Sequence, residues 1–307
     1  MAEISMGEAV GAGFGIIRRR PLAVLAWGAM RTLFAAGMFS FMAPIYLNLF
    51  NRLAAQARTG LTPTPPDFAT MAQMEAGGWL LGMLGGFLMI VIYCAVFRAV
   101  LHPDQNRFAY LRIGMAELFL AVLGVGFYIA FIIGIVVIAI PVGIIVAISA
   151  AAHSAAIGAL IAVLVGLAAV VGVVWIILRL SVVGPMIVQD GKFHLAEAWA
   201  LTRGHAGSLF LIALCMFVIL MLIESVIGVV ALAIGAGVLG QMAGGFSNLP
   251  AFFSRPPATI LANLAPALVV AGLASIPISG TMMAIVAAPW ARAFRDLAQP
   301  DVAATFS

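Results

Sequence analysis

Charged residues are scarce in this chain of 307 residues. Asp, Glu, Lys and Arg make up 8% of it, against about a quarter of an ordinary soluble domain. Hydrophobic residues make up 64%, and the mean hydropathy is +1.19. A soluble protein of this size has too little interior to hide so much apolar surface, so lipid must solvate most of it. The composition therefore predicts an integral membrane protein.

Cysteine is also nearly absent. Cys94 and Cys215 both lie within apolar segments, where they are expected to pack as small apolar side chains. The sequence has no cysteine framework for disulfides, and His194 and His205 lack the neighbouring ligands of a metal site. It therefore predicts neither a metal nor a cofactor.

The patterns of an enzyme or a nucleic-acid-binding protein are missing too. His153 and Ser154 have no nearby carboxylate, so they do not make a hydrolase site. The glycines of Gly11-Ala-Gly13-Phe-Gly15 have neither the spacing nor the preceding strand of a dinucleotide-binding loop. Lys and Arg form no patch suited to nucleic acid. We expect no catalytic residues and no nucleic-acid partner.

What the sequence does contain is six long apolar segments. A helix needs roughly 20 apolar residues to cross the hydrocarbon core of a bilayer. We predict membrane-spanning helices over residues 22–47, 78–99, 128–149, 156–183, 208–236 and 264–289. The predicted fold is all-α, a polytopic membrane protein that forms a single domain over residues 1–307.

A short acidic pattern precedes every second span. It reads Ile4-Ser-Met-Gly-Glu8-Ala, Ile113-Gly-Met-Ala-Glu117-Leu and Phe193-His-Leu-Ala-Glu197-Ala. We interpret it as the start of three cytoplasmic interfacial helices, each followed by a membrane hairpin. This predicts three repeat units, over residues 1–99, 104–184 and 190–296. The alternative is three ordinary juxtamembrane helices that happen to share a glutamate.

The middle copy of this pattern enters an unusually long apolar run, from Ile113 to Ser149. One straight helix over about 37 residues would reach about 55 Å, which is more than the thickness of a bilayer. We therefore predict an interfacial helix over residues 113–126 that is broken at Gly124-Val-Gly126. The span itself is expected to start near Tyr128.

The segment before the second span carries a signal for a helix start. Asp67 precedes Phe68, and aspartate is favoured at this position because its carboxylate accepts hydrogen bonds from amides of the first turn. The pair Gly77-Gly78 favours a helix end. We predict a short helix over residues 68–77 before the second span begins.

The distribution of Lys and Arg predicts the topology. With the N-terminus inside, the cytoplasmic segments hold ten basic residues: Arg18, Arg19, Arg20, Arg98, Arg107, Arg112, Lys192, Arg203, Arg292 and Arg295. The opposite side holds three: Arg52, Arg58 and Arg255. Cytoplasmic loops carry the excess of positive charge in membrane proteins. Both termini are therefore expected in the cytoplasm, which requires an even number of spans.

Two charged residues are expected inside the hydrocarbon core, where such residues are costly and usually functional. Arg31 lies well inside the first span, and Glu224, in the fifth, is its candidate partner. Three interpretations remain open: a direct or water-mediated ion pair, a role in transport or ligand binding, and a Glu224 that is simply protonated. Arg179 is expected to extend to the cytoplasmic headgroups or, alternatively, to pair with Glu117.

Two proline–glycine pairs lie inside predicted spans. Pro141 and Gly143 occur in the third span, and Pro277 and Gly280 in the sixth. A helix broken at such a pair can present backbone carbonyls to a substrate or ion. A kink in a packed helix is the alternative.

Small residues also recur at helical spacing. The row along the fourth span consists of Ala155, Ala159, Ala162, Gly166, Ala169 and Gly172, and the second span has Gly82 and Gly86. Such rows predict close packing between helices, within one chain or between copies in a homo-oligomer.

One region resembles a known family. The segment Arg179-Leu-Ser-Val-Val-Gly-Pro185 is followed by Glu197-Ala-Trp-Ala-Leu-Thr-Arg203-Gly204 and then by another span. This arrangement resembles the membrane domain attached to some bacterial glycerophosphoryl diester phosphodiesterases, and related multi-span bacterial proteins. The resemblance implies an integral bacterial membrane protein. It implies no catalysis, because the phosphodiesterase active site belongs to a separate soluble barrel for which this chain has no room.

The sequence as a whole predicts a non-enzymatic multi-pass protein that acts as a membrane scaffold or accessory subunit. Its predicted contacts are the lipid bilayer and a membrane or cytoplasmic protein partner, made through the three interfacial helices. The alternative is a transporter of a small molecule, an ion or a lipid that uses Arg31, Glu224 and the two proline–glycine pairs.

Overall fold

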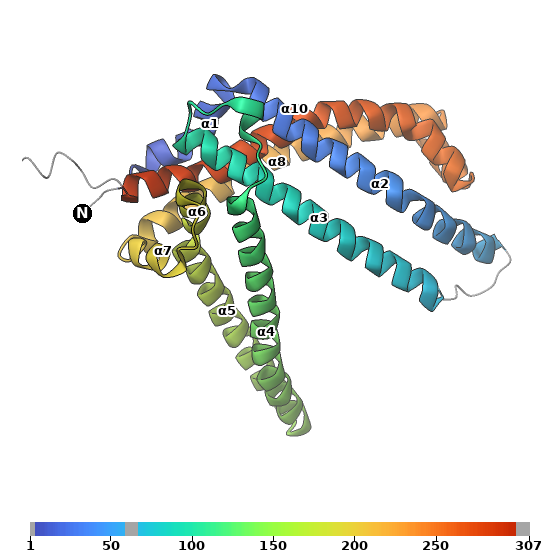
Figure 1. The fold of residues 1–307 in the computed structure, drawn as a ribbon. Coiled ribbons are helices and arrows are strands. Elements are labelled where there is room, and N and C mark those ends of the chain that lie inside the picture. The colour runs from blue at the N-terminus through green and yellow to red at the C-terminus, as the bar shows by residue number, and fades with distance from the viewer. Residues whose placement is uncertain (1–3, 59–66, 299–307) are drawn as a thin grey trace, which may run out of the picture. The chain divides into compact units, whose positions relative to one another are not determined.

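The computed structural model describes residues 4–58 and 67–298, which are helical almost throughout (Figure 1). The long helices are α1 (Met6–Arg19), α2 (Pro21–Arg58), α3 (Phe68–Leu101), α4 (Met115–Ala151), α5 (Ala155–Leu180), α8 (Ala206–Ala243) and α10 (Pro257–Ala298). The short ones are η1 (Arg107–Tyr110), α6 (Val183–Asp190), α7 (Leu195–Leu201), η2 (Phe246–Asn248) and α9 (Leu249–Phe253). No strand occurs among the described residues, which confirms the predicted all-α class.

Six described helical segments are long and apolar enough to cross a membrane. They are Pro21–Leu53, Phe68–Leu101, Arg107–Ala151, Ala155–Asp190, Ala206–Ala243 and Pro257–Ala298. Each predicted span lies inside one of these segments. The chain therefore has the architecture of a multi-pass membrane protein, as predicted.

The chain divides into two compact units. The first, here called the hairpin unit, comprises Met1–Ala12, Tyr93–Leu214 and Ala287–Ser307. The second, here called the crossing unit, comprises Gly13–Ile92 and Cys215–Val286. The boundaries between them fall inside α1, α3, α8 and α10.

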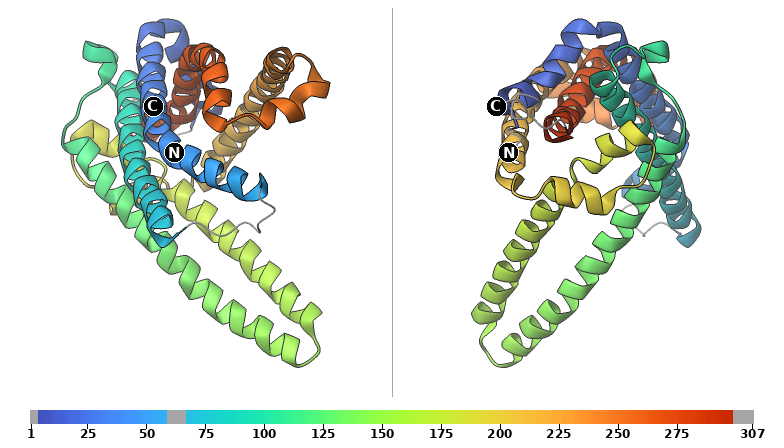
Figure 2. Two further views of the ribbon diagram at one scale, coloured as in Figure 1. Left: turned by 90° about the vertical axis from the view of Figure 1, so that its right-hand side faces the viewer. Right: turned by 60° about the vertical axis from the view of Figure 1, so that its left-hand side comes forward.

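The hairpin unit is built around α4 and α5, which run side by side (Figures 1 and 2). His153 takes a left-handed conformation in the turn between them, and the Ser154 hydroxyl donates to the Ser149 carbonyl at 3.0 Å. A Cβ on Gly158 would lie 2.7 Å from the Ser149 Cβ, so a glycine lets the two helices approach at this end. Near the other end, α6 contacts α4 and α7, and α7 contacts α5.

The predicted break in α4 is wrong. Residues 113–126 do not form a separate element, because α4 is a single helix of 37 residues that runs through Gly124-Val-Gly126. A glycine inside a helix costs only about 1 kcal/mol relative to alanine. In an apolar environment, a broken helix leaves backbone groups unsatisfied at several kcal/mol each, so continuing the helix is favoured.

The helix start at Asp67 is confirmed, whereas the predicted end near Gly77-Gly78 is wrong. Asp67 Oδ1 accepts the backbone N–H of Thr70 at 3.2 Å, and the helix continues to Leu101 as α3. A Cβ on Gly77 would lie 2.6 Å from the Met42 Cε. This glycine therefore allows α3 to approach α2 and does not end the helix.

The crossing unit is organised by a backbone contact between α2 and α10. A Cβ on Gly28 would lie 1.9 Å from a backbone oxygen of α10, and a Cβ on Gly280 would lie 1.9 Å from the Val24 carbonyl oxygen. The hydroxyls of Thr32 and Ser275 lie 3.1 Å apart beside this contact. Such close helix crossings require small residues on both sides, and only glycine fits here.

Neither proline–glycine pair ends its helix. Pro141 and Gly143 lie within α4, and Pro277 and Gly280 lie within α10. Gly280 serves the crossing with α2, which the sequence did not predict.

The small-residue rows mostly face open space. A Cβ on Gly82, Gly86, Gly166 or Gly172 would meet no other atom within 4 Å. Gly85, between the first two, instead lies against the Phe34 ring, 3.1 Å from where its Cβ would be. Packing of these rows against another copy of the chain stays a prediction.

Candidate functional site

The recurring glutamates and a set of arginines gather in the hairpin unit. Glu8, Glu117 and Glu197 each lie in the first turn of their helices, α1, α4 and α7. Arg98 lies in the last turn of α3, Arg179 lies in the last turn of α5, and Arg292 lies near the end of α10. The positive end of a helix dipole favours a carboxylate in the first turn. We call these six residues the arginine–glutamate set.

Arg98 and Glu117 form a buried ion pair. Arg98 Nη2 contacts Glu117 Oε1, and the Gly114 N–H donates to Glu117 Oε2 at 2.9 Å. Arg98 Nη1 donates to the Tyr110 carbonyl at 3.3 Å. The Glu117 side chain is 0% exposed and that of Arg98 is 11% exposed. Removing one partner of such a pair leaves an uncompensated buried charge, which costs about 3–5 kcal/mol.

The segment that covers this ion pair has an unusual backbone. Phe108, Ala109 and Tyr110 have φ values of 50°, 55° and 62°, in the left-handed region. This conformation costs about 1–2 kcal/mol for each residue that is not glycine. Tyr110 is buried, and its hydroxyl donates to the Pro103 carbonyl at 2.9 Å. The ring burial and the bond to Arg98 offset the cost, so the segment holds the ion pair in place.

Arg292 and Glu8 form the second pair, which joins α10 to α1. Arg292 Nη2 contacts Glu8 Oε2, and Arg292 Nε lies 3.0 Å from Asp296 Oδ1. The Nε–H does not point at Asp296, so that contact is an ion pair without a hydrogen bond. The Glu8 side chain is largely exposed. This pair is therefore worth less than the buried one, since water screens it.

Glu197 has a different partner. Its Oε2 contacts His194 Nδ1, and Asp190 Oδ2 lies 3.8 Å from His194 Nε2. All three residues belong to the segment between α6 and α7 or to the ends of these helices. The third glutamate of the set is thus bound locally and makes no ion pair with an arginine in the described part of the chain.

Arg179 lies beside a pair of tryptophans that contact each other. It is 6% exposed, and its guanidinium carbon lies 4.6 Å from the ring centre of Trp199 and 5.8 Å from that of Trp175. Arg179 Nε is buried without a hydrogen-bond partner. Glu117, its alternative partner from the sequence, is bound by Arg98. Among the described residues, Arg179 has no acidic partner.

The two intramembrane candidates lie in the crossing unit. Arg31 and Glu224 are both exposed, and no ion pair joins them in the described part of the chain. The predicted direct pair is therefore not formed. A role for either residue in transport stays a prediction.

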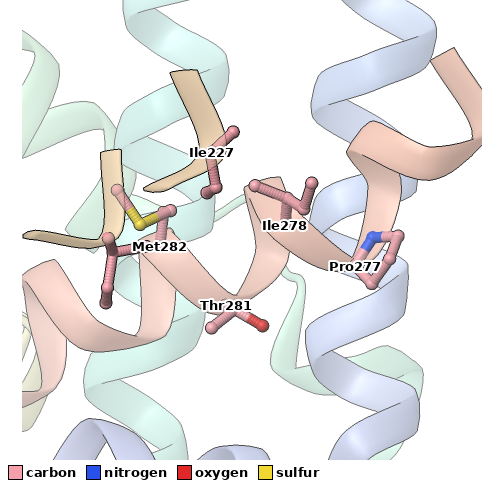
Figure 3. Close-up of a pocket in the computed structure, with 6 residues that line it drawn as sticks. Ile227, Pro277, Ile278, Thr281 and Met282 are labelled. Carbon is pink, nitrogen blue, oxygen red and sulfur yellow. The ribbon is translucent and has the colours of Figure 1, made fainter. Parts of the chain in front are cut away.

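An apolar recess lies between α8 and α10 in the crossing unit (Figure 3). It has a volume of about 230 Å³ and is lined by Ile223, Ile227, Pro277, Ile278, Thr281 and Met282. Glu224 follows Ile223 in the chain but does not line the recess. The Thr281 hydroxyl is the one polar side-chain group among these residues. Sites that bind small molecules are usually larger, at about 300–1,000 Å³.

The chain matches no known protein family, no curated protein and no solved structure. The resemblance of the Arg179–Pro185 region to a phosphodiesterase membrane domain therefore stays a prediction.

Sequence reasoning missed how the arginines are used. Arg98 and Arg292 served there only as topological charges. The signal that identifies them is their position, since each lies near the end of a span, as Arg179 does. Arg98 pairs with Glu117, the next glutamate of the acidic pattern along the chain. Arg292, near the end of α10, pairs with Glu8, the first glutamate of the pattern.

Proposed function

We propose that the protein is a non-enzymatic multi-pass protein of the bacterial inner membrane that acts as a scaffold or accessory subunit. The observation that carries this proposal is the use of charge in the hairpin unit. Arg98 pairs with Glu117, which ties the end of α3 to the start of α4. Arg292 pairs with Glu8, which ties the end of α10 to the start of α1. Arginines that are neutralised by glutamates of the same fold favour a structural role over a catalytic one.

The proposed orientation places both termini and the arginine–glutamate set on the cytoplasmic side. The excess of Lys and Arg in the segments assigned to that side supports it. In the same proposal, α1, the first turns of α4, and α7 lie at the membrane interface and begin three repeat units. The first-turn position of Glu8, Glu117 and Glu197 supports this repeat.

The surface of α4 and α5 is suited to contact with lipid or with another membrane protein. The buried residues of these two helices are Ala116, Glu117, Leu123, Gly158, Leu178 and Arg179. Their other side chains are mainly exposed Ile, Val, Leu and Phe.

Native mass spectrometry of the protein, extracted from its own membrane with its lipids and bound proteins, tests the scaffold role. We expect a stoichiometric protein partner that stays bound in Arg31→Ala and Glu224→Gln variants. The same variants are assayed for solute flux in proteoliposomes, with Ser225→Ala as a matched control on α8. If both variants fold but lose solute flux, the transporter proposal would replace the scaffold proposal.

A further inference from the structure

The three arginines of the set differ in what neutralises them. Arg98 and Arg292 each contact a first-turn glutamate. Arg179 occupies the corresponding place at the end of α5, but its guanidinium lies beside tryptophan rings and has no acidic partner in the described part of the chain. Two of the three arginines therefore have a carboxylate partner in the chain and the third has none. This difference suggests that Arg179 takes an anion from outside the chain.

The glutamates of the set in α4 and α7 are already engaged. Glu117 receives donors at both carboxylate oxygens, from Arg98 and from the Gly114 amide. Glu197, on the same helix as Trp199, is bound by His194. A buried cation with no counter-charge costs several kcal/mol, so a ligand that supplies the charge is strongly favoured.

The surroundings of Arg179 suit a ligand at the membrane interface. Trp175 and Trp199 meet edge to face, with ring centres 5.1 Å apart, and both lie beside the guanidinium. Trp175 is 49% exposed, whereas Arg179 beside it is buried. Tryptophan is enriched where a membrane protein meets the headgroups, since its ring is apolar and its N–H polar. The Thr202 hydroxyl donates to the Arg179 carbonyl at 2.9 Å and holds α7 against the end of α5.

We propose that Arg179 binds the phosphate group of an anionic membrane phospholipid, with Trp175 and Trp199 beside the headgroup. Guanidinium and phosphate match in shape and charge, because two parallel N–H groups can reach two phosphate oxygens. The Arg179 Nε–H has no hydrogen-bond acceptor among the described residues. This inference rests on the proposed membrane orientation. It adds to the proposed function one specific lipid-binding site, at Arg179.

Thermal unfolding of the full chain tests the site, with a thiol-reactive dye as the reporter. Cys94 is buried, so in a Cys215→Ala background the dye reacts when the fold opens. The protein is measured in nanodiscs of phosphatidylcholine, with and without phosphatidylglycerol. A ligand that binds only the folded state raises the Tm. We expect phosphatidylglycerol to raise the Tm of the unmodified protein and to leave that of Arg179→Gln unchanged.

Native mass spectrometry gives a second measurement on the same proteins. We expect one retained phosphatidylglycerol, bound about tenfold more weakly by Arg179→Gln, since a charged hydrogen bond is lost. Arg203→Gln is the matched control, because Arg203 is an exposed arginine just after α7. Arg179→Lys keeps the charge without the paired donors, and we expect it to show an intermediate affinity.

Three results would overturn the proposal. The first is an equal phosphatidylglycerol response in Arg179→Gln. The second is a response lost to the same degree in Arg203→Gln, which would mean unspecific attraction. The third is a Tm rise with inorganic phosphate alone to which the lipid adds nothing, which would make the ligand a free phosphate. Loss of this site leaves the protein partner expected of a scaffold untouched, so the two proposals fail separately.

Discussion

At the scale of single residues, the local partner decides what an arginine does. Arg98 is buried and stabilises the fold because Glu117 and the Tyr110 carbonyl accept its hydrogen bonds. Arg179 is also buried, but it lies beside two tryptophan rings and has no acidic partner among the described residues. Arg31 is exposed along α2. An arginine side chain is therefore expected to contribute differently to the stability of the protein at each of the three positions.

The Arg98–Glu117 pair is expected to dominate the stability of the hairpin unit. Arg98→Met or Glu117→Gln should each lower the free energy of unfolding by about 3–5 kcal/mol, because each leaves one buried partner uncompensated. The double variant Arg98→Met with Glu117→Leu should lose much less than the sum. Unfolding followed by circular dichroism in detergent measures these values. Arg112→Gln is the control, since Arg112 is exposed nearby; additive losses would contradict the coupling.

The cap of α3 is expected to depend on pH. Hydrogen bonds from the Thr70 hydroxyl and Thr70 backbone N–H hold the pKa of Asp67 below its ordinary value of 3.8, with a further contribution from Arg52. A lowered folded pKa means that the cap acts fully above the ordinary value and is lost as the pH falls through the lowered one.

Hydrogen exchange of the first-turn amides of α3 measures this loss. We expect the Thr70 amide to exchange faster as the pH is lowered below about 4, after correction for the intrinsic rate. Asp67→Asn should remove this dependence while keeping a capping side chain. Glu75→Gln, an exposed change on the same helix, should leave the dependence intact. Equal behaviour of all three proteins would contradict the role of Asp67.

At the scale of helices, several glycines and prolines lie inside continuous helices and do not end them. α3 continues through Gly77, α4 through Gly124 and Pro141, and α10 through Pro277. An apolar surrounding offers backbone groups no partner outside the helix, so a helix continues where a loop in water would form. Glycine then serves close approach, as at the α2–α10 crossing.

Gly280→Ala should disrupt the crossing of α2 and α10. Its Cβ would lie 1.9 Å from the Val24 carbonyl oxygen, so the two backbones must move apart. Overpacking of this kind typically costs about 1–3 kcal/mol, and here it also threatens the Thr32–Ser275 contact. Thermal unfolding measures the loss.

Gly272→Ala is the matched control for this change. It lies on the same helix, and its Cβ would meet no other atom within 4 Å. We expect it to leave the Tm unchanged or to raise it slightly, because alanine favours helix. Equal losses in the two variants would show that helix propensity, and not the crossing, explains the effect.

At the scale of the whole molecule, the distribution of charge predicts how the chain lies in the membrane. The cytoplasmic assignment covers Arg98, Arg292 and Arg18–Arg20, while Arg52 and Arg255 fall on the opposite side. Arg98 and Arg292 are engaged in ion pairs, and the predicted topology also counts them among its cytoplasmic charges. One set of residues therefore serves two purposes.

Reporter fusions test the topology. A fluorescent protein at the C-terminus should fluoresce, because it folds in the cytoplasm. Alkaline phosphatase inserted within residues 59–66 should be active, because it requires the oxidising side of the membrane. Phosphatase inserted after Asp104 should be inactive. The reverse pattern, or activity at both sites, would contradict six spans with both termini inside.

The sequence by itself determined the class, the six apolar helices and the helix start at Asp67. These follow from composition and local chemistry, since a run of apolar residues must be helical in lipid wherever it packs. The acidic pattern also located Glu8, Glu117 and Glu197, but not their partners. Only the tertiary structure decided that Arg98 pairs with Glu117 and Arg292 with Glu8, and that Arg179 lies beside two tryptophans. The reason is physical: an ion pair depends on a few ångströms between elements distant in sequence, and periodicity carries no information about that distance.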